Sequence, residues 1–355
     1  MNPSVARLDN LRFSPQHRTQ LGQMCGSDQL FRDRYSIQRV LGRGGFGVTF
    51  LAQDAKLPGS PLCVIKQLCP KVNNPLTLRR AEQRFEREAT ILGQLGSHAQ
   101  VPRLLDYFEE DDEFYLVQEY IKGWTLAKEV KREGALSETA VKRFLLEMLP
   151  VLTYIHQHGV IHRDIKPPNI LRSQDDGRLV LIDFGAVKEQ FVDPDMTTER
   201  HSTTHFVGTL GFAPVEQLAL RPTYASDIFA LGVTCLYLLT GKPPMQFTHD
   251  FVTGEVCWRN VVTVSDHFSR VLDRMLKVSL RDRFQSAVEI QRALELEPHL
   301  SDLQTCMNLR LAVEDVSDDR LLNSGRYLPP TVRTAIAIRR WQSKVIAKGT
   351  RKLVN

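Results

Sequence analysis

The sequence predicts an α+β fold in which strands dominate the first third of the chain. Strand-like runs at 35–41 and 48–52 flank a glycine-rich segment, and an apolar run at 63–66 carries a single lysine. Aromatic and β-branched residues at 107–121 enclose an acidic turn and predict a hairpin. Between these strands, apolar residues at 85–92 recur at helical spacing, which predicts one helix among the strands.

Length and composition are ordinary for a soluble globular protein. The chain has 355 residues, of which 42% are hydrophobic and 25% charged, so it is long enough to bury substantial cores. The longest apolar run, Ile228 to Leu239, is too short to span a bilayer, and no secretory signal is expected because the N-terminus lacks an apolar core. The six cysteines form no C-x-x-C pair, and Cys63 and Cys235 fall in apolar runs, which favours a reduced, cytoplasmic setting.

A glycine-rich segment joins the first two predicted strands. It reads Leu41, Gly42, Arg43, Gly44, Gly45, Phe46, Gly47, Val48 and Thr49. Glycines let backbone amides approach phosphate groups closely. The spacing G-x-G-x-x-G also occurs in dinucleotide-binding turns that open a helix. The β-branched and bulky residues at 48–51 favour a second strand, and therefore a flap over phosphates.

One lysine, Lys66, ends the apolar run that begins at Cys63. A lysine in such a run is costly to bury unless it is paired. The expected partner is Glu88, which lies beside the apolar positions of the predicted helix, and Glu86 is the competing candidate.

The most informative pattern runs from His162 to Leu171 and, after a short predicted strand at 179–182, continues with Asp183, Phe184 and Gly185. Its candidate functional residues are Asp164, Lys166, Asn169 and Asp183. Phosphoryl transfer needs a group that orients the attacking hydroxyl and cations that hold the charge on three phosphate oxygens. Either motif alone is usually only a turn, but the two in this order, with a strand between them, predict that chemistry.

The pattern H-R-D-x-K-x-x-N followed by D-F-G resembles the catalytic segment of eukaryotic-type (Hanks-type) serine/threonine protein kinases. The resemblance implies a two-lobed fold, with a small β-rich N-lobe at about 35–120 that contains one key helix. A larger, mainly helical C-lobe is expected at about 124–297, so that the kinase domain covers 35–297. The family register E-x-x-I-L selects Glu88 over Glu86.

The resemblance also assigns roles to residues. Asp164 would orient the attacking hydroxyl, and Lys166 would stabilise the γ-phosphate of ATP. Asn169 and Asp183 would bind Mg²⁺, with Mn²⁺ as an alternative metal. The nucleotide would contact the glycine-rich segment, Val64, Lys66, Glu88, Gln118, Glu119 and Ile121. Thr49 departs from the valine that is usual over the adenine.

The segment Gly208–Glu216 resembles the end of the kinase activation loop, although A-P-x-E replaces the usual A-P-E. The family implies a buried helix that starts near Asp227 and a structural ion pair between Glu216 and Arg283. Five hydroxyls precede this segment: Thr197, Thr198, Ser202, Thr203 and Thr204. Either they only keep the loop soluble, or their phosphorylation regulates the enzyme through Arg163. Thr209 is excluded, since in the family its hydroxyl packs against the catalytic aspartate and lysine.

Residues 1–34 form an N-terminal extension whose end, Met24 to Tyr35, resembles the junction in cyanobacterial kinases with a four-cysteine zinc ribbon. Only Cys25 of that motif is present, and with His17 it would supply at most two of the four ligands that tetrahedral zinc needs. We therefore expect a degenerate ribbon without zinc.

The C-terminal tail, 298–355, contains an acidic patch and then a basic segment at 331–352 without acidic residues. Its apolar positions predict a partly amphipathic helix. The basic side chains either contact an acidic partner, nucleic acid or an anionic membrane, or form a solvated face while the apolar side packs on the protein.

The sequence thus predicts an ATP- and Mg²⁺-dependent protein serine/threonine kinase that autophosphorylates and acts in bacterial signalling. Two alternatives belong to other classes. A pseudokinase scaffold would be expected to lose Lys66, Asp164 or Asp183, which are all present. A small-molecule phosphotransferase typically lacks the A-P-x-E segment and the long loop before it.

Overall fold

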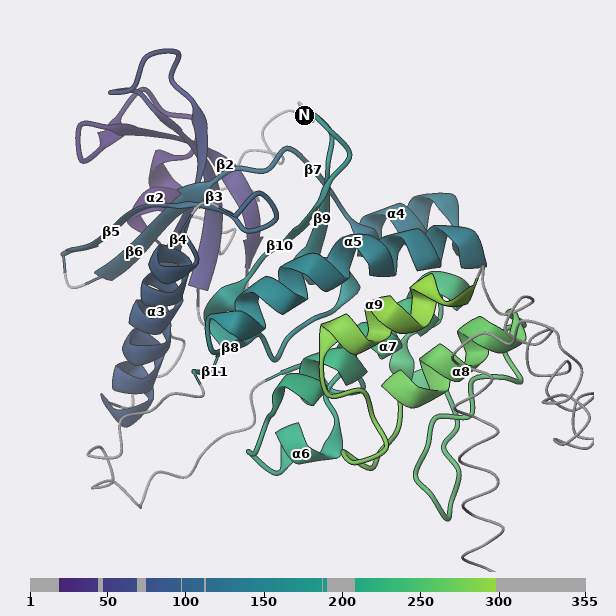
Figure 1. Ribbon diagram of the computed structural model, residues 1–355. Coiled ribbons are helices and arrows are strands. Elements are labelled where there is room, and N and C mark those ends of the chain that lie inside the picture. Colours follow the sequence, from purple (N-terminus) through teal and green to yellow (C-terminus); the bar gives the residue numbers. More distant parts are fainter. Residues whose placement is uncertain are drawn as a thin grey trace, which may run out of the picture. The chain divides into compact units, whose positions relative to one another are not determined.

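The computed structural model describes residues 19–43, 47–68, 75–96, 98–111, 113–186, 188–189 and 208–297. Over this part, a six-stranded antiparallel sheet with one long helix forms an N-lobe, and a mainly helical C-lobe follows, which confirms the predicted α+β fold (Figure 1). The N-lobe elements are α2 (Gln20–Met24), β1 (Leu30–Phe31), β2 (Tyr35–Arg43), β3 (Gly47–Asp54), β4 (Leu62–Leu68), α3 (Pro75–Leu95), β5 (Leu104–Glu110) and β6 (Glu113–Glu119).

The N-lobe sheet has the strand order β1-β2-β3-β4-β6-β5. The glycine-rich segment joins β2 to a strand, β3, because Val48, Thr49 and Phe50 favour an extended backbone. This arrangement excludes the dinucleotide-binding turn, which would open a helix. The predicted hairpin is also present, as β5 and β6.

The N-lobe begins earlier than the sequence indicated. Residues 19–34, predicted as part of a separate extension, belong to its sheet and core: β1 pairs with β2, and Leu21 and Phe31 are buried. The Phe31 ring lies 4.8 Å from that of Tyr115 on β6. A two-residue strand is too short to show periodicity, so only tertiary packing reveals it. His17 and the rest of 1–18 lie outside the described residues.

The C-lobe is built around α7, whose side chains are buried along most of its length. Its elements are β7 (Gly123–Thr125), α4 (Leu126–Glu133), α5 (Glu138–Gln157), β8 (Val160–Ile161), η2 (Pro167–Asn169), β9 (Ile170–Ser173), β10 (Leu179–Leu181), η3 (Phe184–Ala186), β11 (Lys188–Glu189), α6 (Val215–Leu218), α7 (Tyr224–Thr240), η4 (Pro244–Gln246), α8 (Asp266–Met275) and α9 (Ala287–Glu295). One apolar core joins α3 of the N-lobe to α5, α7 and α8.

By contacts the chain divides after Leu294, close to the expected end of the kinase domain at 297. The predicted acidic patch and basic segment of the tail lie outside the described residues and stay predictions. In the described part of the chain, every helix is too short or too polar to cross a membrane.

Candidate active site

An ion-paired triad connects the N-lobe sheet to α3 and to the D-F-G motif. Lys66 Nζ on β4 lies 2.6 Å from Glu88 Oε1 on α3 and 2.9 Å from Asp183 Oδ1. Glu88 is buried, whereas Glu86, the competing candidate, is exposed. The structure therefore confirms Glu88 as the partner of Lys66.

Lys66 favours the ionised form of both carboxylates in this triad, and both carboxylates favour its ammonium form. Burial alone would lower the pKa of the Lys66 ammonium, but Asp183 and Glu88 outweigh it, so this pKa is raised. The Lys66 charge holds the pKa of Asp183 at about 2, below its ordinary value. Burial raises the pKa of Glu88 despite the attraction of Lys66. Lys66 and Asp183 are thus both charged at neutral pH.

A second polar cluster surrounds Asp164. Its Oδ2 lies 2.7 Å from Lys166 Nζ and accepts a hydrogen bond of 2.8 Å from Asn169 Nδ2. Thr209 donates its hydroxyl to Asp164 Oδ1 at 2.7 Å and accepts from Lys166 Nζ at 2.6 Å. The contact expected for Thr209 is therefore present, and it connects the end of the activation segment to the catalytic loop.

The backbone on either side of this cluster is strained. Arg163 and Asp183 have φ of +68° and +67°, a left-handed conformation that costs about 1–3 kcal/mol for residues other than glycine. Asp227, in the first turn of α7, holds the backbone of Arg163 in this conformation. Its fully buried carboxylate accepts hydrogen bonds from the backbone N–H groups of His162 at 2.9 Å and Arg163 at 2.8 Å. His156 Nε2 lies 2.9 Å from the same carboxylate.

Asp227 is a functional residue whose role the sequence did not reveal. Its motif predicted the start of a buried helix, which α7 confirms. The hydrogen bonds from the catalytic loop to Asp227 join residues more than sixty positions apart, so no local sequence pattern indicates them. Gln217 was also missed: its Nε2 donates to the carbonyl of Arg163 at 2.6 Å.

The D-F-G segment packs into the core beneath α3. Phe184 is buried, and His162 meets its ring edge-on at 4.8 Å between centroids. Burial lowers the pKa of His162 below its ordinary value. Ile182 N donates to Asn169 O at 2.9 Å, so the two motifs share a backbone hydrogen bond.

The predicted nucleotide-contacting residues converge from four strands. Leu41, Gly42 and Arg43 lie on β2, Gly47, Val48 and Thr49 on β3, Val64 on β4, Gln118 and Glu119 on β6, and Ile121 just after β6. Thr49 pairs with Lys66, and Val64 with Gln118, so these positions share one region of the sheet. At Gly47 an added Cβ would lie 2.3 Å from Gln67 O, and only glycine fits there. Gly44, Gly45 and Phe46 lie outside the described residues.

The expected structural ion pair of the C-lobe is present. Arg283 Nη1 lies 2.6 Å from Glu216 Oε1, and both side chains are buried. The guanidinium also donates to the carbonyls of Ala225 and Lys277. The additional residue in A-P-x-E is accommodated because Val215 and Glu216 form the first turn of the short helix α6.

The fold and this geometry place the chain in a known family. Residues 35–295 match the protein kinase domain, and the chain belongs to the protein kinase family.

Its curated relatives include bacterial and eukaryotic enzymes. The chain is 53% identical to serine/threonine-protein kinase B of Synechocystis sp. over 79% of its own length and 49% of that protein. It is 44% identical to serine/threonine-protein kinase PknA of Nostoc sp. over 76% of its length and 48% of that protein. Mouse Aurora kinase C is 33% identical over 60% of this chain and 72% of that kinase. The chain thus spans about half the length of the cyanobacterial relatives.

Proposed function

We propose that this protein transfers the γ-phosphate of ATP to serine or threonine hydroxyls of proteins. The observation that carries the proposal is the Asp164 cluster beside the Lys66–Glu88–Asp183 triad. A carboxylate, two lysines and two candidate metal ligands surround one region, which suits a reaction whose demands are positioning and charge stabilisation.

Each side chain has a part in this reaction. Asp164 Oδ1 orients the substrate hydroxyl and takes up its proton, and Thr209 and Asn169 fix the carboxylate. Lys166, 2.7 Å from the same carboxylate, contacts the γ-phosphate and stabilises its developing charge. Lys66 contacts the α- and β-phosphates, and Glu88 keeps its ammonium in place.

The family uses a divalent cation, and the residues present fit Mg²⁺. Asn169 uses its Nδ2 to bind Asp164, which leaves the amide Oδ1 as an oxygen donor, and Asp183 is ionised. Hard oxygen donors of this kind suit Mg²⁺ and also Mn²⁺. The bound ion would neutralise charge on the phosphate oxygens. No zinc is expected, and a cytoplasmic location, which the four free cysteines among the described residues favour, is also proposed.

Radiolabelled ATP separates this function from the two alternatives. Wild-type protein should transfer label to a generic protein substrate and to itself, and the Asp164→Asn variant should transfer to neither. A pseudokinase scaffold would label nothing above that variant. A small-molecule phosphotransferase would consume ATP only when metabolites are added.

We propose in addition that phosphorylation of the activation loop regulates the enzyme. The candidate hydroxyls at Thr197, Thr198 and 202–204 lie outside the described residues, but their proposed receptor does not. Arg163 Nε is buried and has no hydrogen-bond partner among the residues that the structure describes. Burial, and then repulsion from Arg84 and Arg87 on α3, lowers the pKa of its guanidinium. Three guanidinium groups near one another favour an anion such as a phosphate between them.

Mass spectrometry after incubation with ATP tests this regulation. Phosphate is expected on Thr203 or Thr204 in wild-type protein and absent from Asp164→Asn. Full activity after alanine replaces all five loop hydroxyls would show that no loop phosphate is needed.

A further inference from the structure

A glutamine, Gln118, lies on the face of the N-lobe sheet that also carries Lys66. Side chains of a strand alternate between the two faces of a sheet, so Val64 and Lys66 of β4 point to the same side. Residues that pair directly across antiparallel strands share a face, and Gln118 of β6 pairs with Val64. The Gln118 amide therefore lies on the face of the Lys66 ammonium, one residue pair along the sheet.

The Gln118 amide lacks a partner within the described part of the chain. The residue is buried, with 9% of its surface exposed. Its neighbours in the sheet are apolar: Val64 on β4, Leu104 on β5 and Leu116 on β6. None of the residues that the structure describes forms a hydrogen bond with the amide oxygen or nitrogen. A buried amide without a partner is costly, so we expect a ligand to supply one.

Adenine offers hydrogen-bonding groups that match those of an amide. On one edge of the purine, the N6 amino group donates hydrogen bonds and N7 beside it accepts one, and a glutamine amide can meet both atoms at once. Guanine has the oxygen O6 in place of that amino group, so the same edge presents two acceptors. The amide oxygen would then face another acceptor, and one of the two hydrogen bonds would be lost.

The position of Lys66 indicates which edge of the base meets Gln118. In the proposed function, Lys66 contacts the α- and β-phosphates of ATP. In the usual anti conformation of a nucleotide, the C8–N7 side of the purine lies on the same side as the 5′-phosphates. A nucleotide with its phosphates at Lys66 and its base toward Glu119 would therefore turn N7 and N6 toward the sheet face that carries both Lys66 and Gln118.

We propose that the Gln118 side chain recognises the base of the nucleotide and sets a preference for ATP over GTP. Its Oε1 accepts a hydrogen bond from the N6 amino group of adenine, and its Nε2 donates one to N7. The observation that carries this inference is a buried amide without a partner on the same sheet face as Lys66. The inference rests on the proposed function, which supplies the contact between Lys66 and the phosphates.

Nucleotide analogues test the contact without any change to Gln118. The full chain with Asp164→Asn allows nucleotide affinity to be measured without phosphoryl transfer, by displacement of a fluorescent ATP that is labelled on its ribose. 7-Deaza-ATP carries a C–H group in place of N7. This analogue and GTP should each bind about fivefold or more weakly than ATP, because a bidentate contact to a base discriminates by at least that factor. Equal affinities for ATP and 7-deaza-ATP would overturn the proposal.

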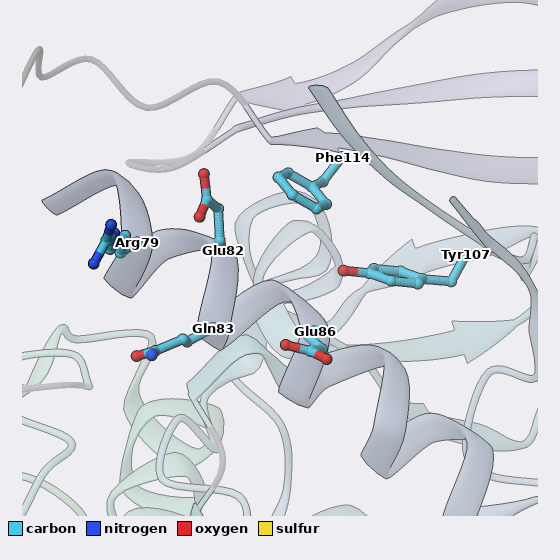
Figure 2. Close-up of a pocket in the computed structure, with 6 residues that line it drawn as sticks. All are labelled: Arg79, Glu82, Gln83, Glu86, Tyr107 and Phe114. Carbon is cyan, nitrogen blue, oxygen red and sulfur yellow. The ribbon is translucent and has the colours of Figure 1, made fainter. Parts of the chain in front are cut away.

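Gln118→Met, added to the same protein, removes the amide and nearly keeps the size of the side chain. This variant should bind ATP and 7-deaza-ATP equally, and its preference for ATP over GTP should narrow about fivefold. The matched control is Gln83→Met at an exposed position of α3, where Figure 2 shows Gln83 extending away from Tyr107 and Phe114. The control should discriminate as the parent protein does. The same discrimination in Gln118→Met would refute the proposal.

Unfolding by urea without nucleotide gives a second readout. Because the amide lacks a partner, Gln118→Met should be at least as stable as wild type, whereas loss of a hydrogen-bonded amide would destabilise the protein. An unfolding midpoint clearly below those of wild type and Gln83→Met would show that the protein itself satisfies the amide, and would overturn the proposal. If only the proposed function fails, phosphoryl transfer is absent from wild type while the discrimination in nucleotide affinity remains.

Discussion

Asp227→Asn is expected to weaken both the stability and the activity of the protein, although the residue touches no substrate. The carboxylate is fully buried, and its two oxygens accept hydrogen bonds from different backbone N–H groups, those of His162 and Arg163. Asparagine keeps the size of the side chain but has a single oxygen. In either orientation of the amide, one N–H group of the catalytic loop loses its acceptor.

The expected loss in the free energy of unfolding follows from the single N–H group that loses its acceptor. One buried donor without an acceptor costs about 1–3 kcal/mol, and the lost charge adds to this cost. The free energy of unfolding from urea titrations should fall by about that amount. The catalytic rate should fall more than the affinity for ATP, because Arg163 adjoins Asp164 and its left-handed backbone depends on this support.

The control is Asp176→Asn, in the exposed turn before β10, which should change neither quantity. Unfolding free energies that agree within about 0.5 kcal/mol between wild type and Asp227→Asn, with unchanged turnover, would refute the reasoning.

Three further predictions concern other parts of the molecule. Arg283→Leu leaves Glu216 buried without its cation and should lower the free energy of unfolding, measured with denaturant, by about 3–5 kcal/mol. Arg259→Leu, which removes an exposed ion pair with Asp273, should lower it far less, and similar losses in the two variants would contradict this prediction. Burial lowers the pKa of His162, so the unfolded state binds a proton more readily than the folded state, and the free energy of unfolding falls as the pH decreases below about 6.5. His162→Phe should reduce this fall in unfolding curves measured between about pH 7 and 5, and an unchanged slope would refute this prediction. The Cys25 thiol donates a hydrogen bond to Leu21 O at 3.5 Å, and burial raises the pKa of this thiol. Cys25→Ser should therefore leave the melting temperature unchanged, and elemental analysis of the protein should find no stoichiometric zinc. One equivalent of bound zinc would contradict this prediction.

Local motifs allowed much of the site to be predicted. Lys66 was evident because a lysine in a buried strand requires a partner, and helical spacing restricted that partner to two glutamates. Asp164, Lys166, Asn169 and Asp183 follow one another closely in the chain, so a short segment brings them together. The strand β3 was evident because β-branched and bulky residues follow the glycines, and β2 was evident from the strand-like run at 35–41.

Long-range contacts could not be predicted in this way. The hydrogen bonds from His162 and Arg163 to Asp227 depend on how α7 packs under the catalytic loop. The inclusion of Leu21 and Phe31 in the N-lobe core depends on a strand of two residues, which has no periodicity of its own.

The most direct test of the central claim is the phosphoryl-transfer rate of Lys66→Ala and Asp183→Ala, measured with labelled ATP beside wild type. Circular dichroism should show that both variants remain folded. We predict that each loses phosphoryl transfer, because the first lacks the cation at the phosphates and the second lacks a metal ligand. Residual rates within about tenfold of wild type, a barrier difference of only about 1.4 kcal/mol, would contradict the account.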